Sequence, residues 1–201
     1  DVERIQKLSG AHLLLNDTWP GGRFRALKAA VETGADAIQY ADLDRLIRWV
    51  ETRPDEWHTT AKRIQRSDCL VIGRTQAAWA THPQVMIQVE KIINDVFSFH
   101  LGQELDFGAG SKGFSLAAAE FIVANGEPNG AIGSDTEWPI LCQRAGFLVE
   151  DWRVDGLDWE IPDQYQEKAA DLQRQTEVSA QYDADVKHWM YRVSTTTEAI
   201  D

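Results

Sequence analysis

Apolar residues along the chain follow two alternating periods. Short, nearly unbroken apolar runs predict strands over 11–15, 37–40 and 68–73, and residues 147–150 and 153–154 are also strand-like. Between these runs, apolar residues three and four positions apart predict helices over 22–33, from 43, from 54, over 83–100, over 115–126 and from 134 to just before Gly146. Alternating strands and helices are typical of an α/β fold with a mostly parallel central sheet.

The pattern also divides the chain into two parts. Residues 1–162 carry the strand and helix alternation, whereas 163–201 are polar and helical with a weaker period. We therefore expect one α/β domain followed by a helical extension. The first residues are typical of a helix end that leads directly into a strand, so we also expect that an amino-terminal portion of the domain precedes residue 1.

Composition and charge restrict the class of protein. The 201 residues include 32 acidic and 20 basic side chains, a net charge of −12, which disfavours a nucleic acid partner. No apolar run reaches the roughly 18 residues of a membrane span. Cys69 and Cys142 both lie in apolar runs, as expected of small buried residues in a reducing compartment. We expect a cytoplasmic domain.

A pair of aspartates is the strongest chemical signal. Asp42 and Asp44 follow the apolar run Ala37 to Tyr40 and are separated by one residue. If the strand continues through them, their side chains point the same way and can converge on one hard divalent cation. Such a pair suits Mg²⁺ or Mn²⁺ on a nucleotide diphosphate, although a solvated turn or a helix cap also accommodates two nearby aspartates.

Two further stretches are candidates for binding. Residues 103–113 are expected to form a loop, and its Gly108, Gly110 and Gly113 would allow close approach to a phosphate, but the spacing is not that of a P-loop. Asp135 and Glu137 lie at the start of a predicted helix, where the helix dipole alone would favour acids.

The order of these segments resembles one family. They are 34–44 (Gly-Ala-Asp-Ala-Ile-Gln-Tyr-Ala-Asp-Leu-Asp), 67–74 (Ser-Asp-Cys-Leu-Val-Ile-Gly-Arg), 94–114 (ending in Ser-Lys-Gly-Phe) and 133–135 (Gly-Ser-Asp). Over roughly residues 10 to 155 the chain resembles glycosyltransferases of the GT-A fold, especially the family 2 branch that includes dolichyl-phosphate mannose synthase. The resemblance implies a Rossmann-like three-layer sandwich that transfers a sugar from a nucleotide-diphosphate sugar to a hydroxyl or phosphate acceptor, which is a small molecule or a lipid phosphate.

The resemblance also implies roles for individual residues. Asp42 and Asp44 would hold Mg²⁺ or Mn²⁺, and the donor would also contact Arg74, Asp106, Gly110, Lys112 and Gly113. Asp135 would be the catalytic base of an inverting enzyme or would bind the acceptor in a retaining one, and Glu137 would orient the acceptor or replace the base. Ser134 departs from the family, which usually has glutamate at this position.

Two alternatives stay open at this point. A nucleotidyltransferase would also use strand-end aspartates and a metal, but it would release pyrophosphate instead of a nucleoside diphosphate. A binding domain that keeps the fold without catalysis would give no response to Mn²⁺ with a nucleotide.

Overall fold

The computed structural model describes residues 7, 10–16, 18–128, 133–164 and 166–200. The helices are α2 (Trp19–Glu32), α3 (Leu43–Thr52), α4 (Pro54–Ile64), α5 (Gln76–Trp79), α6 (Gln84–Leu101), α7 (Leu116–Asn125), α8 (Gly133–Arg144), α9 (Leu172–Ala184) and α10 (Val186–Ile200). The strands are β1 (Ala37–Ala41), β2 (Cys69–Arg74), β3 (Ser111–Ser115) and β4 (Val149–Val154), with short 3₁₀ turns η1 (Phe107–Ala109) and η2 (Ile161–Asp163).

The four strands form a mixed sheet in the order β1-β3-β2-β4. Strand β3 pairs antiparallel with both β1 and β2, and only β2 and β4 pair in parallel. The α/β class is confirmed, but the expected mostly parallel sheet is wrong. The reason is β3, whose sequence Ser-Lys-Gly-Phe-Ser lies partly within the stretch predicted as a glycine loop and has only one large apolar residue.

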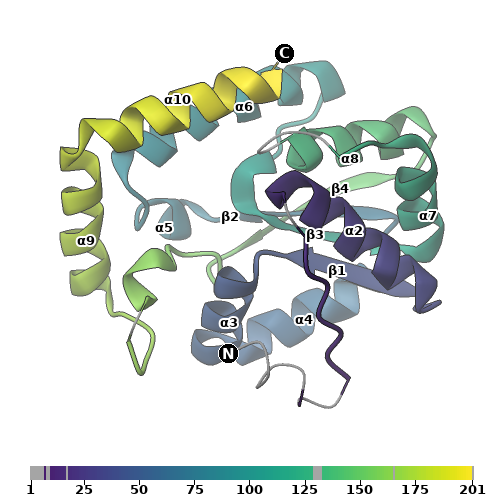
Figure 1. The fold of residues 1–201 in the computed structure, drawn as a ribbon, viewed down its shortest axis with the longest axis horizontal. Coiled ribbons are helices and arrows are strands. Elements are labelled where there is room, and N and C mark those ends of the chain that lie inside the picture. Colours follow the sequence, from purple (N-terminus) through teal and green to yellow (C-terminus); the bar gives the residue numbers. More distant parts are fainter. Residues whose placement is uncertain (1–6, 8–9, 17, 129–132, 165, 201) are drawn as a thin grey trace.

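Helices cover both faces of the sheet (Figure 1). Along β2, Cys69 and Val71 belong to the apolar cluster shared with Phe114 and Trp138, whereas Leu70 and Ile72 belong to the opposite cluster. This alternation follows from the two-residue period of a strand. Strand β2 is buried on both faces, since every one of its residues is buried.

Helix α3 is amphipathic, but its apolar stripe faces away from the core. Leu43 and Ile47 are 64% and 57% exposed, while Arg45, Arg48 and Trp49 are buried. The two arginines are buried because each meets carboxylates within the fold. The stripe therefore predicted the helix correctly, but it did not predict which side packs inward.

Other differences are local. Residues 11–16 form no strand and are mostly exposed. The two strand-like pieces after residue 146 form the single strand β4, and Pro139 lies inside α8. Cys69 and Cys142 are both buried and free.

The carboxyl-terminal part consists mainly of α9 and α10. Helix α10 lies along α6 (Figure 1) and is the element with which α6 makes its most extensive contact. A third apolar cluster around Met86 and Trp159 includes Tyr182 and Trp189 from this part. The division at residue 162 remains a prediction, but α9 and α10 pack directly on the preceding elements.

Candidate functional site

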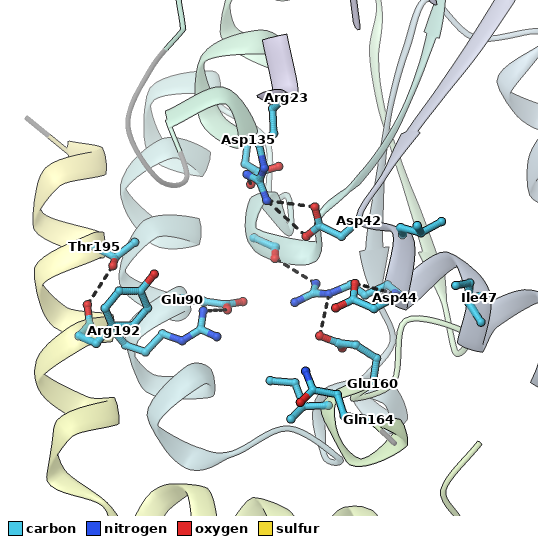
Figure 2. Close-up of a pocket in the computed structure, with 15 residues that line it drawn as sticks. Arg23, Asp42, Asp44, Ile47, Glu90, Asp135, Glu160, Gln164, Arg192 and Thr195 are labelled. Atoms are coloured by element: carbon cyan, nitrogen blue, oxygen red, sulfur yellow. Dashed lines mark hydrogen bonds and ion pairs between the residues drawn. The ribbon is translucent and has the colours of Figure 1, made fainter. Parts of the chain in front are cut away.

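A cavity of about 660 Å³ lies where β1 ends and α3 begins. Its lining residues come from α2, α3, α6, α8, α10 and the loops around η1 and η2 (Figure 2). Asp42, Asp44 and Asp135 all line it, so three of the predicted site residues meet at one place. Tertiary structure brings Asp135 close to Asp42, although the two residues are 93 positions apart in the sequence.

Arg23 connects the two sides of this cavity. Its Nη1 donates to Oδ2 of Asp135 at 2.9 Å, and its Nη2 donates to Oδ1 of Asp42 at 3.0 Å (Figure 2). Arg23 is 7% exposed and its guanidinium also lies 5.9 Å from the Tyr40 ring. Such charge-assisted contacts, made by a planar fork of donors, hold both carboxylates in defined positions.

Asp42 and Asp44 do not lie on one strand. Strand β1 ends at Ala41, Asp42 is the residue before α3, and Asp44 is in the first turn of that helix, where its Oδ1 accepts the backbone N–H of Arg45 at 2.9 Å. The strand alternation that predicted their convergence therefore does not apply. They face the same cavity because the chain changes direction between them.

Gly110 packs directly against Asp42. Its φ is +66°, and a Cβ added there would lie 2.6 Å from Oδ2 of Asp42. The backbone N–H of Asp42 donates to the Gly110 carbonyl at 3.0 Å. Gly110 therefore positions the aspartate, and a larger residue would displace the carboxylate.

The pocket carries excess negative charge. Five carboxylates and three guanidiniums are among its described lining residues, which leaves two negative charges when all are ionised. Burial raises the pKa of Asp42, and Arg23 and Arg45 offset part of that effect. Removing a carboxylate from water disfavours its ionised form, so a bound cation would be stabilised here.

The fit of a metal ion depends on the ligand that accompanies it. Within the described residues, no three His, Cys, Asp or Glu side chains are arranged so that they could hold a metal ion. Mg²⁺ sites in phosphate-binding proteins often use only one or two carboxylates, with substrate phosphates and water completing the shell. Asp42 and Asp44 fit that kind of site and do not form a complete protein cage.

Asp135 has both carboxylate oxygens engaged. Lys112 Nζ donates to Oδ1 at 2.6 Å, opposite the Arg23 contact at Oδ2. Burial opposes ionisation of Asp135, but Lys112 and Arg23 outweigh it and hold the pKa of the carboxyl below its usual value. A base of low pKa accepts protons poorly, so this arrangement favours a positioning role over proton transfer.

Arg74 and Asp106 form a buried network beside the cavity. Arg74 donates to both oxygens of Asp106 at 2.7 and 2.8 Å and to Glu90 at 2.7 Å, and its guanidinium lies 3.5 Å from the centroid of the Trp79 ring. Asn94 adds a further bond to Asp106 at 3.0 Å. Only Glu90 of this group lines the cavity, so Arg74 and Asp106 are placed to support it and not to contact a ligand there.

Four other predicted residues do not line the cavity, and one of them is Gly110, which packs against Asp42. Lys112 is fully buried behind Asp135, Gly113 lies within β3 against Ile64, and Glu137 lies on α8 with its carboxylate near Gly126. The predicted roles of Gly113 and Glu137 in ligand contact therefore find no geometric support in this arrangement.

Several lining residues were missed by the sequence analysis. They are Arg23, Arg45, Glu90, Glu160, Tyr191, Arg192 and Thr195. One carried a usable signal, because Glu160 stands between Trp159 and Ile161. Arg192 carried none, since only the packing of α10 on α6 brings it to within 3.7 Å of Glu90.

Comparisons with known proteins add no identification: no protein-family model, no curated protein and no solved structure matches the chain. In the part of the chain that the structure describes, no helix combines the length and hydrophobicity needed to cross a membrane. The resemblance to glycosyltransferases therefore rests on the sequence motifs alone.

Proposed function

We propose that this protein is a metal-dependent glycosyltransferase that moves a sugar from a nucleotide-diphosphate sugar to an acceptor hydroxyl or phosphate. One observation carries the proposal: Asp42, Asp44 and Asp135, the residues that the motifs singled out for donor and acceptor chemistry, line one cavity of suitable size. The α/β fold with helices on both faces of the sheet is compatible with a GT-A-like domain, which remains part of the proposal.

In this proposal Asp42 and Asp44 hold Mg²⁺ or Mn²⁺ against the donor diphosphate. The metal supplies Lewis acidity that neutralises charge on the leaving diphosphate. Arg45, whose Nη1 donates to the Ala109 carbonyl at 2.6 Å, fixes the loop after α6 beside the aspartates. The excess negative charge of the cavity favours a donor that arrives together with its cation.

Asp135 has a different role from the base that its motif suggests. It holds Arg23 toward Asp42 and pairs with Lys112, so accepting a proton would first require these ion pairs to weaken. An acceptor that is already an anion, such as a phosphate, needs no base. The depressed pKa of Asp135 is therefore more compatible with a phosphate acceptor than with a hydroxyl.

The first test measures nucleotide binding through its effect on thermal unfolding. Mn²⁺ with UDP, GDP or ADP at about 100 times the dissociation constant should stabilise the protein by roughly 2.7 kcal/mol, or about 5 to 10 °C for a chain of this size. We expect a rise with one nucleotide only in the presence of metal. The Asp44→Asn variant should lose the metal-dependent part of this rise and still fold.

The matched control is Asp95→Asn. Asp95 is an exposed carboxylate on α6 whose pairing with Lys91 lies outside this cavity, so the nucleotide response should be unchanged. An unaltered response in Asp44→Asn would contradict the metal assignment. Release of pyrophosphate in an activity assay would favour a nucleotidyltransferase, and no response to any nucleotide would favour a binding domain.

A further inference from the structure

One wall of the cavity contains a buried carboxylate that is incompletely paired. Glu160 is 6% exposed and lines the cavity. Its Oε1 lies 3.4 Å from Nε of Arg45, but its Oε2 has no hydrogen-bond partner among the described residues (Figure 2). Buried polar atoms in folded proteins are nearly always hydrogen-bonded, so an acceptor of this kind at a cavity wall calls for a donor.

The segment that carries Glu160 is held on both sides by Arg48. The Arg48 guanidinium donates to both oxygens of Asp158 at 2.7 and 2.9 Å and to both oxygens of Asp163 at 2.7 and 2.9 Å. Its Nη2 also donates to the Ala170 carbonyl at 3.0 Å. Arg48 therefore fixes the residues before and after Glu160 at the same time.

Backbone contacts restrain the same segment. The backbone N–H of Trp159 donates to Oγ1 of Thr81 at 2.8 Å, and Nε2 of Gln175 on α9 donates to the Trp159 carbonyl at 2.8 Å. The N–H of Asp163 donates to the Glu160 carbonyl at 2.9 Å. The carboxylate is thus presented on a rigid support, as expected of a residue that recognises a ligand.

The electrostatic surroundings indicate which kind of donor is needed. Burial raises the pKa of Glu160, Arg45 and the residue's own backbone amide lower it, and Asp44 and Asp42 raise it. Arg45 already supplies an opposite charge at Oε1. The unpaired Oε2 therefore lacks a hydrogen-bond donor more than it lacks a counter-ion. A sugar hydroxyl supplies such a donor without adding charge.

We propose that Glu160 binds hydroxyl groups of the sugar portion of the donor and so contributes to sugar specificity. This inference rests on the proposed function, because it assumes that the diphosphate lies beside Asp42 and Asp44. Figure 2 shows Asp44 and Glu160 on the same wall, so a sugar attached to that diphosphate lies within reach of Glu160. The carboxylate accepts hydrogen bonds and takes no part in bond breaking.

The test compares each nucleoside diphosphate with its sugar nucleotide in the presence of Mn²⁺. Isothermal titration uses UDP against UDP-glucose, GDP against GDP-mannose and ADP against ADP-glucose. In Glu160→Gln we expect the preferred sugar nucleotide to bind on the order of 10- to 100-fold more weakly, as for a lost hydrogen bond to a charged group. Binding of the nucleoside diphosphate should change less than about twofold.

Two further variants keep the result interpretable. Glu177→Gln is the matched control, because Glu177 is half exposed on α9 and does not line the cavity. Glu160→Asp keeps the charge and shortens the side chain, and it should show the same selective loss of sugar-nucleotide binding. It replaces Glu160→Gln in the test if that variant does not fold.

The possible results separate this inference from the proposed function. Equal weakening of both ligands, weakening of Mn²⁺ binding alone, or no change in either ligand would overturn the role of Glu160 and leave the nucleotide site standing. If the unaltered protein binds none of the nucleotides or sugar nucleotides, the proposed function fails and the inference fails with it.

Discussion

At the scale of single residues, burial separates supporting side chains from those that meet a ligand. Arg74 and Asp106 are residue types expected at a donor site, yet both are almost completely buried and pair with each other. Asp42 and Asp44 are partly accessible and line the cavity. The sequence contains all four residues, but it cannot distinguish these two environments.

The buried Arg74 and Asp106 pair should contribute strongly to stability. Asp106→Asn would leave the Arg74 guanidinium with only part of its charge compensation, and breaking a buried pair costs about 3 to 5 kcal/mol. Urea unfolding at neutral pH should show that loss. The exposed pair of Lys91 and Asp95 is the comparison, since its removal should cost less than about 1 kcal/mol. Equal losses at the two sites would contradict the structural role.

At the scale of elements, β3 shows why the sheet could not be predicted. Its residues have low strand propensity, and Gly113 is present because α4 packs closely over it. A Cβ at Gly113 would lie 2.5 Å from Cγ1 and 2.8 Å from Cγ2 of Ile64. A glycine that favoured a ligand loop in the sequence is therefore required by helix packing in the structure.

This contact predicts coupling between two substitutions. Gly113→Ala should destabilise by about 1 to 3 kcal/mol through overpacking, and Ile64→Ala by about 2 to 5 kcal/mol through a cavity. In the double variant the added methyl group would occupy part of the vacated space, so the combined loss should be smaller than the sum by at least about 0.5 kcal/mol. Denaturant unfolding of the four proteins measures the difference.

A second glycine provides the control for that experiment. Gly22 lies in α2 with only ordinary contacts around an added Cβ, so Gly22→Ala should leave stability unchanged or raise it by up to about 1 kcal/mol. Strictly additive losses at residues 64 and 113 would show that β3 and α4 are not in close contact.

At the scale of the whole molecule, ion pairs within the fold join distant segments. Lys112 of β3 and Arg23 of α2 meet Asp135 of α8, and Arg48 of α3 meets Asp158 and Asp163. Because these groups are removed from water, the stability of the entire domain depends on their ionisation.

Stability should therefore change with pH in two opposite ways. Burial opposes ionisation of Asp106 and Asp135, but Arg74 holds the pKa of Asp106, and Lys112 that of Asp135, below the usual value. The two ionised carboxylates therefore stabilise the folded state fully above about pH 4. This stabilisation is lost as the pH falls through their folded-state pKa values. The pKa values of Asp42 and Glu160 are raised by burial, so protonating them on mild acidification relieves a cost. We expect a shallow rise in stability below neutrality and a steep fall under about pH 4.

Urea unfolding between about pH 7 and about pH 3 measures both limbs. Asp106→Asn should flatten the acid limb, and Glu160→Gln should reduce the shallow rise. A free energy of unfolding that stays constant to about pH 3 would contradict the assigned ion pairs.

The sequence by itself determined most elements and part of the site. The periodic apolar residues predicted α4, α6 and α7 and the strand β2, because helices and strands depend on the local spacing of apolar residues. The pair Asp42 and Asp44 was recognisable because the two aspartates are close together in the sequence. Residues 42, 44 and 135 were predicted as functional and do line one cavity.

Only the tertiary structure decided how these parts meet. Strand β3 has its place because β1 and β2 provide pairing partners, and α3 buries Arg45 and Arg48 because carboxylates from distant segments face them. Glu160 and Arg192 reach the cavity through the packing of the carboxyl-terminal helices and the loop that they support. Local spacing carries no information about such contacts, since their energy comes from residues that are far apart in the sequence.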